Sequence, residues 1–547
     1  MPAKYSYELY NNNNVDINSY EDFFTLNINL GMCINNYKLL ENSFYKMFND
    51  KSLLMYVVTN SNKIHDHINI ISYLLKTNTI INQQNSEGWT ALMFASKFSN
   101  STSNINVVIF LIESGANINI RNNLGLTAFM ITCRETNTTS SINLVKLFLT
   151  YNIDINQCDK QGNTALIHAV LKSNNELSYN TVQLLIKNKA NINIQNNNGC
   201  TALMYACRYS NSTSSIDSVK LLLDNNAKTE LREKDGWTSL MLAARYSNNG
   251  SSEDTIKLLL DYNTDINAID KSGNTALILA TKHSLNDSSI KTVTYLLFKG
   301  ANPNIQNLKG YTALMYAINY YKKESDPICI PLLLCNNANS NLLSYNNGNK
   351  SALHIMIEKN SNDICNICDL NDLKLLLLNG SNINQKDENG NTPIMLAGKL
   401  SLKSYILVLI TNRANLCVKN NQGETFFTYY NSNNIIKTLI NTYINSLIKN
   451  NIYIDDNIYD FMIENKIKTN DKIINIKISL LFLYKNHIIF DIDNDNKECN
   501  ICFDHNNNLK AKCDHVYCVN CFNKLKKCPE CHENILGDKF PIFYDKL

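Results

Sequence analysis

A repeat with a period of 37 residues is the feature that most constrains what this chain can fold into. Its markers are glycines, at Gly88, Gly125, Gly162, Gly199, Gly236, Gly273 and Gly310, and then at less regular spacing at Gly348, Gly390 and Gly423. A unit of this length cannot bury its apolar face alone, but stacked neighbours can bury it. The period therefore predicts a solenoid of stacked units in place of one compact core.

Each unit is typical of two short helices joined by a polar loop. The marker glycine allows a positive φ in a tight turn, and a threonine two residues later, such as Thr201, can cap the first helix. Leu203 and Ala206 then place apolar atoms on one face of that helix. After a Ser- and Asn-rich loop, Ser214 or Ser215 can cap the second helix. The apolar positions of the second helix are Val219, Leu222 and Leu223.

The repeated Thr-Ala-Leu triplet, as at 164–166, and the later Gly-Ala-Asn-Ile-Asn phrase at 115–119 make the chain resemble ankyrin repeats. The resemblance covers 51–442 as about 10 repeats, each longer than the usual period of about 33 residues. We expect the extra residues to lie in the loop between the two helices, away from the hairpin tips, as plain solvated loops. A second binding surface is the alternative. The histidine of the usual Thr-Pro-Leu-His is kept only at His354, so we expect packing to replace its link between repeats. Such expanded, Asn-rich units are similar in style to those of giant DNA viruses.

Ankyrin arrays bind proteins with their hairpin tips and first helices, so the resemblance implies a protein partner. Trp89, Trp237 and Tyr311 each follow a marker glycine directly. Packing against the neighbouring turn is the favoured interpretation of these three aromatic residues. Contact with a substrate protein is the alternative.

The C-terminal segment concentrates metal-binding residues. Of 17 cysteines, seven lie between Cys499 and Cys531, in the register Cys-x2-Cys-x10-Cys-x-His-x2-Cys-x2-Cys-x6-Cys-x2-Cys. Thiolates and imidazole in closely spaced pairs are typical zinc ligands, and eight ligands predict two four-coordinate ions. Cys365 and Cys368 have no second pair, so we interpret them as an incidental pair.

The order of three cysteines, one histidine and four cysteines resembles the RING finger, in which the two sites interleave. The resemblance implies one zinc on Cys499, Cys502, Cys518 and Cys521, and a second on Cys513, His515, Cys528 and Cys531. Both ions are expected to be structural, because every coordination position is filled.

The RING family binds a ubiquitin-charged conjugating enzyme and has no catalytic residue of its own. The positions that match its conjugating-enzyme surface are Ile501, Leu525 and Pro529, with His532 where many members have Arg or Lys. Packing of the small zinc-bound core is the alternative role of these apolar residues.

The whole chain is therefore predicted to be mostly α: an ankyrin-repeat solenoid followed by a small zinc-binding RING domain. The expected boundaries are a helical cap at 1–50, the array at 51–442, a helical cap and linker at 443–495, the RING at 496–535 and a tail at 536–547. The most favoured function is a RING-type ubiquitin ligase whose array recruits a protein substrate. The alternative is a non-enzymatic scaffold whose RING mediates only protein–protein contact.

Composition disfavours other classes. The 51 basic and 48 acidic residues nearly balance, and residues 496–547 carry no basic face, so we expect no nucleic-acid partner. No stretch approaches the roughly 20 apolar residues of a membrane span, so we expect no membrane partner and a cytoplasmic protein, of the host cell if the chain is viral. No P-loop or hydrolase motif is present.

Native mass spectrometry of the full chain is expected to show two zinc ions per polypeptide, because eight ligands fill two sites. A double Cys499→Ser, Cys502→Ser variant is expected to lose one ion, and Cys365→Ser is the matched control that keeps both. Fewer than two ions on the unmodified chain would contradict the predicted module.

Overall fold

The computed structural model describes residues 51–76, 79–136, 138–359, 367–449, 508–510 and 516–518. These residues are mostly helical, as predicted, and belong to two compact units, Met1–Asp265 and Ile266–Leu547. The cap predicted at 1–50 lies outside the described residues. So does most of the segment after Lys449. Along the described ranges, no helix is long and apolar enough to cross a membrane.

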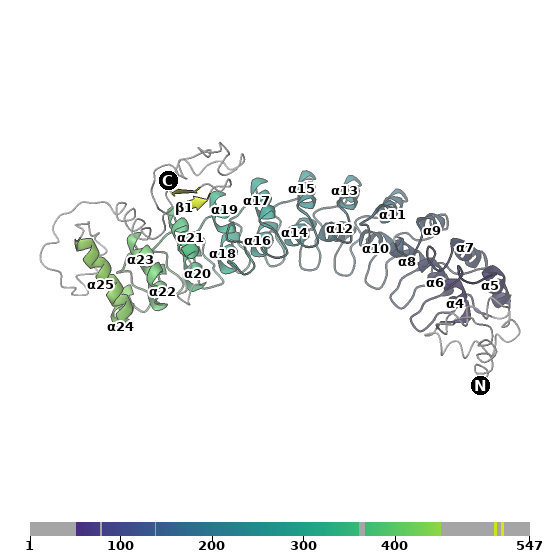
Figure 1. Cartoon of the computed structure of the whole chain (residues 1–547), viewed down its shortest axis with the longest axis horizontal. Coiled ribbons are helices and arrows are strands. Elements are labelled where there is room, and N and C mark those ends of the chain that lie inside the picture. Colours follow the sequence, from purple (N-terminus) through teal and green to yellow (C-terminus); the bar gives the residue numbers. More distant parts are fainter. Residues whose placement is uncertain are drawn as a thin grey trace, which may run out of the picture. The chain divides into compact units, whose positions relative to one another are not determined.

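The first unit consists of helix pairs that stack in two layers (Figure 1). Each first helix packs on the first helix of the next pair and on its own second helix. The first helices are α4 (Leu53–Thr59), α6 (Ala91–Lys97), α8 (Ala128–Glu135), α10 (Ala165–Val170), α12 (Ala202–Tyr209) and α14 (Ser239–Arg245). The second helices are α5 (His67–Lys76), α7 (Ile105–Glu113), α9 (Ile142–Phe148), α11 (Glu176–Lys187), α13 (Ile216–Asp224) and α15 (Glu253–Asp261).

The second unit repeats the same arrangement. Its first helices are α16 (Ala276–Lys282), α18 (Ala313–Asn319), α20 (Ala352–Lys359), α22 (Pro393–Lys399) and α24 (Phe426–Ser432). Its second helices are α17 (Ile290–Phe298), α19 (Cys329–Cys335), α21 (Ile367–Leu378), α23 (Lys403–Thr411) and α25 (Asn434–Lys449). A two-stranded antiparallel hairpin follows, with β1 (Asn508–Lys510) and β2 (Val516–Cys518).

Side-chain caps define where the helices begin. Thr201 has extended dihedral angles, and its hydroxyl accepts a hydrogen bond from the N–H of Met204 at 3.3 Å, which confirms the predicted cap. The sulfur of Met204 in turn accepts from the Thr201 N–H at 3.5 Å. Of the two candidates for the second helix, Ser215 is the cap, because its hydroxyl accepts from the N–H of Ser218 at 3.2 Å.

The core lies between the two helical layers and between neighbouring repeats. Leu203 and Ala206 of α12 are 1% and 0% exposed, as the sequence predicts. The predicted apolar face of α13 is buried as well, at Val219, Leu222 and Leu223. The marker glycines permit this close stacking: Gly162 has φ +80°, and a Cβ there would lie 2.6 Å from the backbone nitrogen of Asn197 in the next repeat.

Asparagine side chains link the hairpin tips of successive repeats. The N–H of Asn191 donates to the Oδ1 of Asn156 at 2.8 Å, and the N–H of Asn302 donates likewise to Asn267. The amide of Asn197 donates to the Lys160 carbonyl at 2.8 Å. Polar links between repeats are therefore frequent at the hairpin tips. At the register of the missing histidine, Met204 and Met241 are buried, as expected if packing replaces its link.

Serine side chains make a second set of links in the loops between the two helices. These loops hold the extra residues of each repeat, as predicted, for example at 210–215 between α12 and α13. Asn211, Ser212 and Thr213 are exposed, but Ser173 and Ser214 are 0% and 3% exposed, and their hydroxyl oxygens lie 2.9 Å apart. The expectation of plain solvated loops is wrong for these serines, because they join one repeat to the next.

His354 links its repeat to the next one by a hydrogen bond, as the histidine of the Thr-Pro-Leu-His motif is expected to do. Its Nδ1 accepts hydrogen bonds from the Ser351 N–H at 3.2 Å and hydroxyl at 2.8 Å, so Nε2 carries the ring proton. Nε2 then donates to the carbonyl of Asn391 in the next repeat at 3.1 Å. The side chain is fully buried, and burial lowers the pKa of His354.

We expect His354→Met to remove an acid-sensitive part of the stability of the second unit. A buried imidazole whose pKa lies below its ordinary 6.5 stabilises the fold above that pH, and the contribution is lost as the pH falls below it. Urea midpoints at about pH 7.5 and about pH 5 should therefore differ less in the variant than in the unmodified chain. Met315→Leu, at the same register of α18, is the control that should keep the full difference. Equal differences in all three proteins would contradict the role of His354.

Candidate functional site

The exposed face of the first helices carries a repeated pairing of cations with aromatic rings. The last turn of several first helices carries a basic residue, namely Lys97, Arg134, Arg208 and Arg245 in the first unit and Lys282 in the second. Cations are favoured at a helix C-terminus by the helix dipole. Most of them also lie over rings: the Nζ of Lys97 is 5.4 Å from the ring centroid of Trp89, and that of Lys282 is 4.9 Å from Tyr320.

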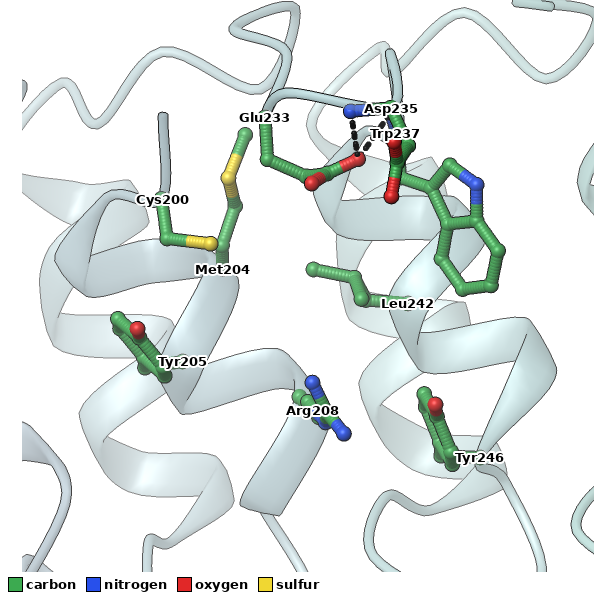
Figure 2. A pocket seen from close by; sticks show the side chains of 9 residues that line it. All are labelled: Cys200, Met204, Tyr205, Arg208, Glu233, Asp235, Trp237, Leu242 and Tyr246. Atoms are coloured by element: carbon green, nitrogen blue, oxygen red, sulfur yellow. Dashed lines mark hydrogen bonds between the residues drawn. The ribbon is translucent and has the colours of Figure 1, made fainter. Parts of the chain in front are cut away.

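A pocket of about 180 Å³ opens on this face between α12 and α14 (Figure 2). Its lining comes from the two first helices and the residues next to their ends, and from the hairpin tip that precedes α14. The lining residues are Cys200, Met204, Tyr205, Arg208, Glu233, Asp235, Trp237, Leu242 and Tyr246.

Aromatic rings hold the cation of this pocket in place. The guanidinium carbon of Arg208 lies 4.6 Å from the ring centroid of Tyr246 and 5.2 Å from that of Tyr209. Tyr209 in turn stacks on Tyr205, with centroids 6.5 Å apart. Among the described residues, no carboxylate forms an ion pair with Arg208. A half-buried cation without a carboxylate partner is available to a ligand.

The hairpin tip supplies the opposite charge. Glu233 Oε1 accepts hydrogen bonds from the N–H groups of Asp235 at 2.8 Å and Trp237 at 3.0 Å, which fixes the shape of the turn. Asp235 is exposed beside it. In Figure 2, Glu233 and Asp235 lie at one end of the pocket and Arg208 at the other, with Leu242 between them.

The remaining polar groups of the pocket are neutral. Burial raises the pKa of the Tyr205 phenol, whose oxygen accepts a hydrogen bond from the Asn196 amide at 3.0 Å. Burial and, less strongly, the Glu233 carboxylate raise the pKa of the Cys200 thiol. Both groups stay protonated near neutral pH, so Cys200 is not a reactive thiolate. The Tyr205 phenol and the Cys200 thiol are therefore uncharged parts of the pocket lining.

The three aromatic residues singled out in the sequence have different surroundings. The Trp89 ring lies 5.1 Å from Phe94, and Tyr311 is 9% exposed with its ring 5.2 Å from Tyr316. The Tyr311 hydroxyl also accepts a hydrogen bond from the Asn347 amide at 2.7 Å. Trp237 alone of the three lines the pocket.

Sequence reasoning missed Arg208 and Tyr246. The signal for both was present, because a basic residue followed by an aromatic one recurs at 97–98, 208–209 and 245–246, in register with the glycine repeat. Each such pair ends a first helix, so the register predicts that the side chains share one face of the stack.

The predicted zinc ligands lie outside the described residues, except for the backbone of Cys518 in β2. The residues predicted to bind a conjugating enzyme, Ile501, Leu525, Pro529 and His532, lie outside them as well. Within the described ranges, no group of three or more His, Cys, Asp or Glu side chains is placed to hold a metal ion.

The two strands lie within the predicted zinc-binding segment. Asn508 pairs with Cys518, and Lys510 pairs with Val516. The predicted ligands other than Cys518 lie outside the described residues, so their grouping stays a prediction.

One family comparison covers most of the repeats. The family model for ankyrin repeats (3 copies) matches residues 29–122, 99–193, 129–231, 173–270, 214–307 and 284–369, which together span more than half of the chain. No curated protein matches the chain.

Trp89→Ala is expected to lower the stability of the first unit by about 1–3 kcal/mol, because the ring packs on Phe94 and lies beneath Lys97. The measurement is the urea midpoint followed by circular dichroism. Leu124→Ala is the control, since Leu124 is 60% exposed at a hairpin tip and should change little. Equal midpoints for Trp89→Ala and the unmodified chain would show that the Trp89 ring has no packing role.

Proposed function

Because the chain belongs to the ankyrin-repeat family, we propose that its helical units hold a protein substrate while the C-terminal segment recruits a ubiquitin-charged conjugating enzyme. Ankyrin repeats bind protein partners, and stacked repeats present the extended surface such binding needs. The same chain ends in eight zinc-ligand residues in RING order. That register is the observation that carries the proposal of a RING-type ubiquitin ligase.

The order of the ligand pairs along the chain supports interleaved zinc sites. The first ion would be held by Cys499, Cys502, Cys518 and Cys521, and the second would include Cys513 and His515. Zinc, when bound, supplies folding energy to a segment too short for an apolar core of its own. The second ion would be completed by Cys528 and Cys531.

Ubiquitin transfer in this proposal rests on proximity. The segment contributes no nucleophile: the reactive thioester belongs to the conjugating enzyme and the attacking lysine to the substrate. Holding both partners on one chain raises their effective concentration and orients them. Ile501, Leu525 and Pro529 would form the apolar groove that grips the conjugating enzyme. If the likeness to giant-virus proteins holds, that enzyme would be the host's.

A non-enzymatic scaffold is the second candidate, and His532 favours it. Many active RING fingers place Arg or Lys after the last ligand, where it bridges the conjugating enzyme and ubiquitin. A neutral imidazole donates one hydrogen bond and lacks the planar fork of a guanidinium. In the scaffold the zinc module would only dimerise or dock.

Autoubiquitination of the full chain with a panel of conjugating enzymes separates the two candidates. The ligase proposal expects ubiquitin conjugates with at least one enzyme, and a loss of about tenfold or more in Ile501→Ala, because a buried groove residue would be truncated. Ile542→Ala, in the predicted tail, is the matched control and should keep activity. His532→Arg should increase the rate, since the guanidinium restores the missing fork.

Absence of conjugates with every enzyme, in a preparation that holds two zinc ions, would overturn the ligase and favour the scaffold. Conjugates that persist unchanged in Ile501→Ala would place the enzyme contact elsewhere and contradict the proposed groove.

A further inference from the structure

The pocket between α12 and α14 is too small for most small-molecule ligands. Its volume is about 180 Å³, whereas ligand pockets for drug-sized molecules occupy about 300–1,000 Å³. A space of this size takes a single side chain. The proposed function has the helical units hold a protein partner, and the resemblance to ankyrin arrays implies binding by their hairpin tips and first helices. A partner side chain is therefore the natural occupant.

The middle of the pocket is apolar. Met204 and Leu242 project from the two helices, and Trp237 covers one side from the hairpin tip. These groups gain nothing from a charged occupant, because burying a charge among them would cost its hydration. An aliphatic side chain of leucine size fits both the volume and the chemistry.

The two ends of the pocket carry opposite charges (Figure 2). Arg208 lies at the helix end, fixed by Tyr246 and Tyr209 and without a carboxylate partner among the described residues. Glu233 and Asp235 lie at the hairpin end. A partner with two acidic groups would meet repulsion at the hairpin end, and one with two basic groups would meet it at Arg208.

We propose that this pocket binds a short segment of the protein partner in which an aliphatic side chain is flanked by a carboxylate on one side and a basic group on the other. The aliphatic side chain enters between Met204 and Leu242. The carboxylate pairs with Arg208, and the basic group faces Glu233 and Asp235. This inference rests on the proposed role of the repeats in holding a partner, and it specifies which chemistry they select.

The test uses the full chain and four labelled peptide pools with random flanks around a central leucine. At the two flanking charge positions, peptides of the mixed pool carry one Lys and one Glu. Peptides of the other three pools carry two Glu, two Lys or two Gln residues there. Either order of Lys and Glu belongs to the mixed pool, because a peptide can lie across the pocket in either direction. Fluorescence anisotropy measures the affinity of each pool.

The mixed pool is expected to bind at least about threefold more tightly than the other three, since each matched exposed charge pair adds modestly. Replacing its leucine with glycine should abolish saturable binding. Arg208→Glu should shift the preference to the doubly basic pool, and Arg208→Gln should remove the advantage of the mixed pool over the doubly basic one. Lys97→Glu, at the same register of α6 outside the pocket, is the matched control and should keep the unmodified order.

An affinity order that Arg208→Glu leaves unchanged would overturn the proposal, and so would tightest binding of the doubly acidic pool or no saturable binding at all. None of these outcomes affects the autoubiquitination assay, which does not depend on the pocket. Failure of that assay alone would overturn the ligase and leave the peptide preference standing.

Discussion

Each repeat of this chain leaves polar backbone groups and an apolar face that only its neighbour can satisfy. The side-chain oxygen of Asn156 accepts a hydrogen bond from the backbone N–H of Asn191. In the loops between the two helices, the buried hydroxyl oxygens of Ser173 and Ser214 lie 2.9 Å apart. Buried polar groups are costly when unpaired. The hydrogen bonds between repeats are therefore the constraint on which the geometry of every exposed face depends.

This framework determines where the candidate pocket can form. Glu233 fixes its own turn through two backbone N–H groups, and that turn positions Trp237 above Leu242. The stacking of α12 on α14 sets the gap that Arg208 faces. The repeat frame fixes the positions of the pocket-lining residues, while their identities differ from unit to unit. The residue types at these fixed positions therefore determine which partner such a surface binds.

The sequence predicts the helix pairs well, because glycine, threonine and leucine recur at fixed offsets and each has one local role. Thr201 caps its helix and Leu203 is buried, as expected. The pairing of Ser173 with Ser214 was not predictable in the same way, since serine in a polar loop usually indicates exposure. The pocket was not predictable from the sequence, because it depends on which side chains of adjacent repeats lie together. The periodicity within one repeat does not show that. The zinc ligands were predicted from their spacing, and they remain a prediction.

The hydrogen bonds of the hairpin tips also determine which of their asparagines tolerate deamidation. Asparagine is a thermolabile residue, and deamidation replaces its side-chain amide with a carboxylate. At the turn position shared by Asn122 and Asp159, the side-chain Oδ1 accepts the turn's N–H groups, and the chain itself uses both residue types there. Asn197 differs, because its amide donates to the Lys160 carbonyl. Deamidation at Asn122 would keep the acceptor, whereas at Asn197 it would place a carboxylate against a carbonyl oxygen and weaken the contact between two repeats.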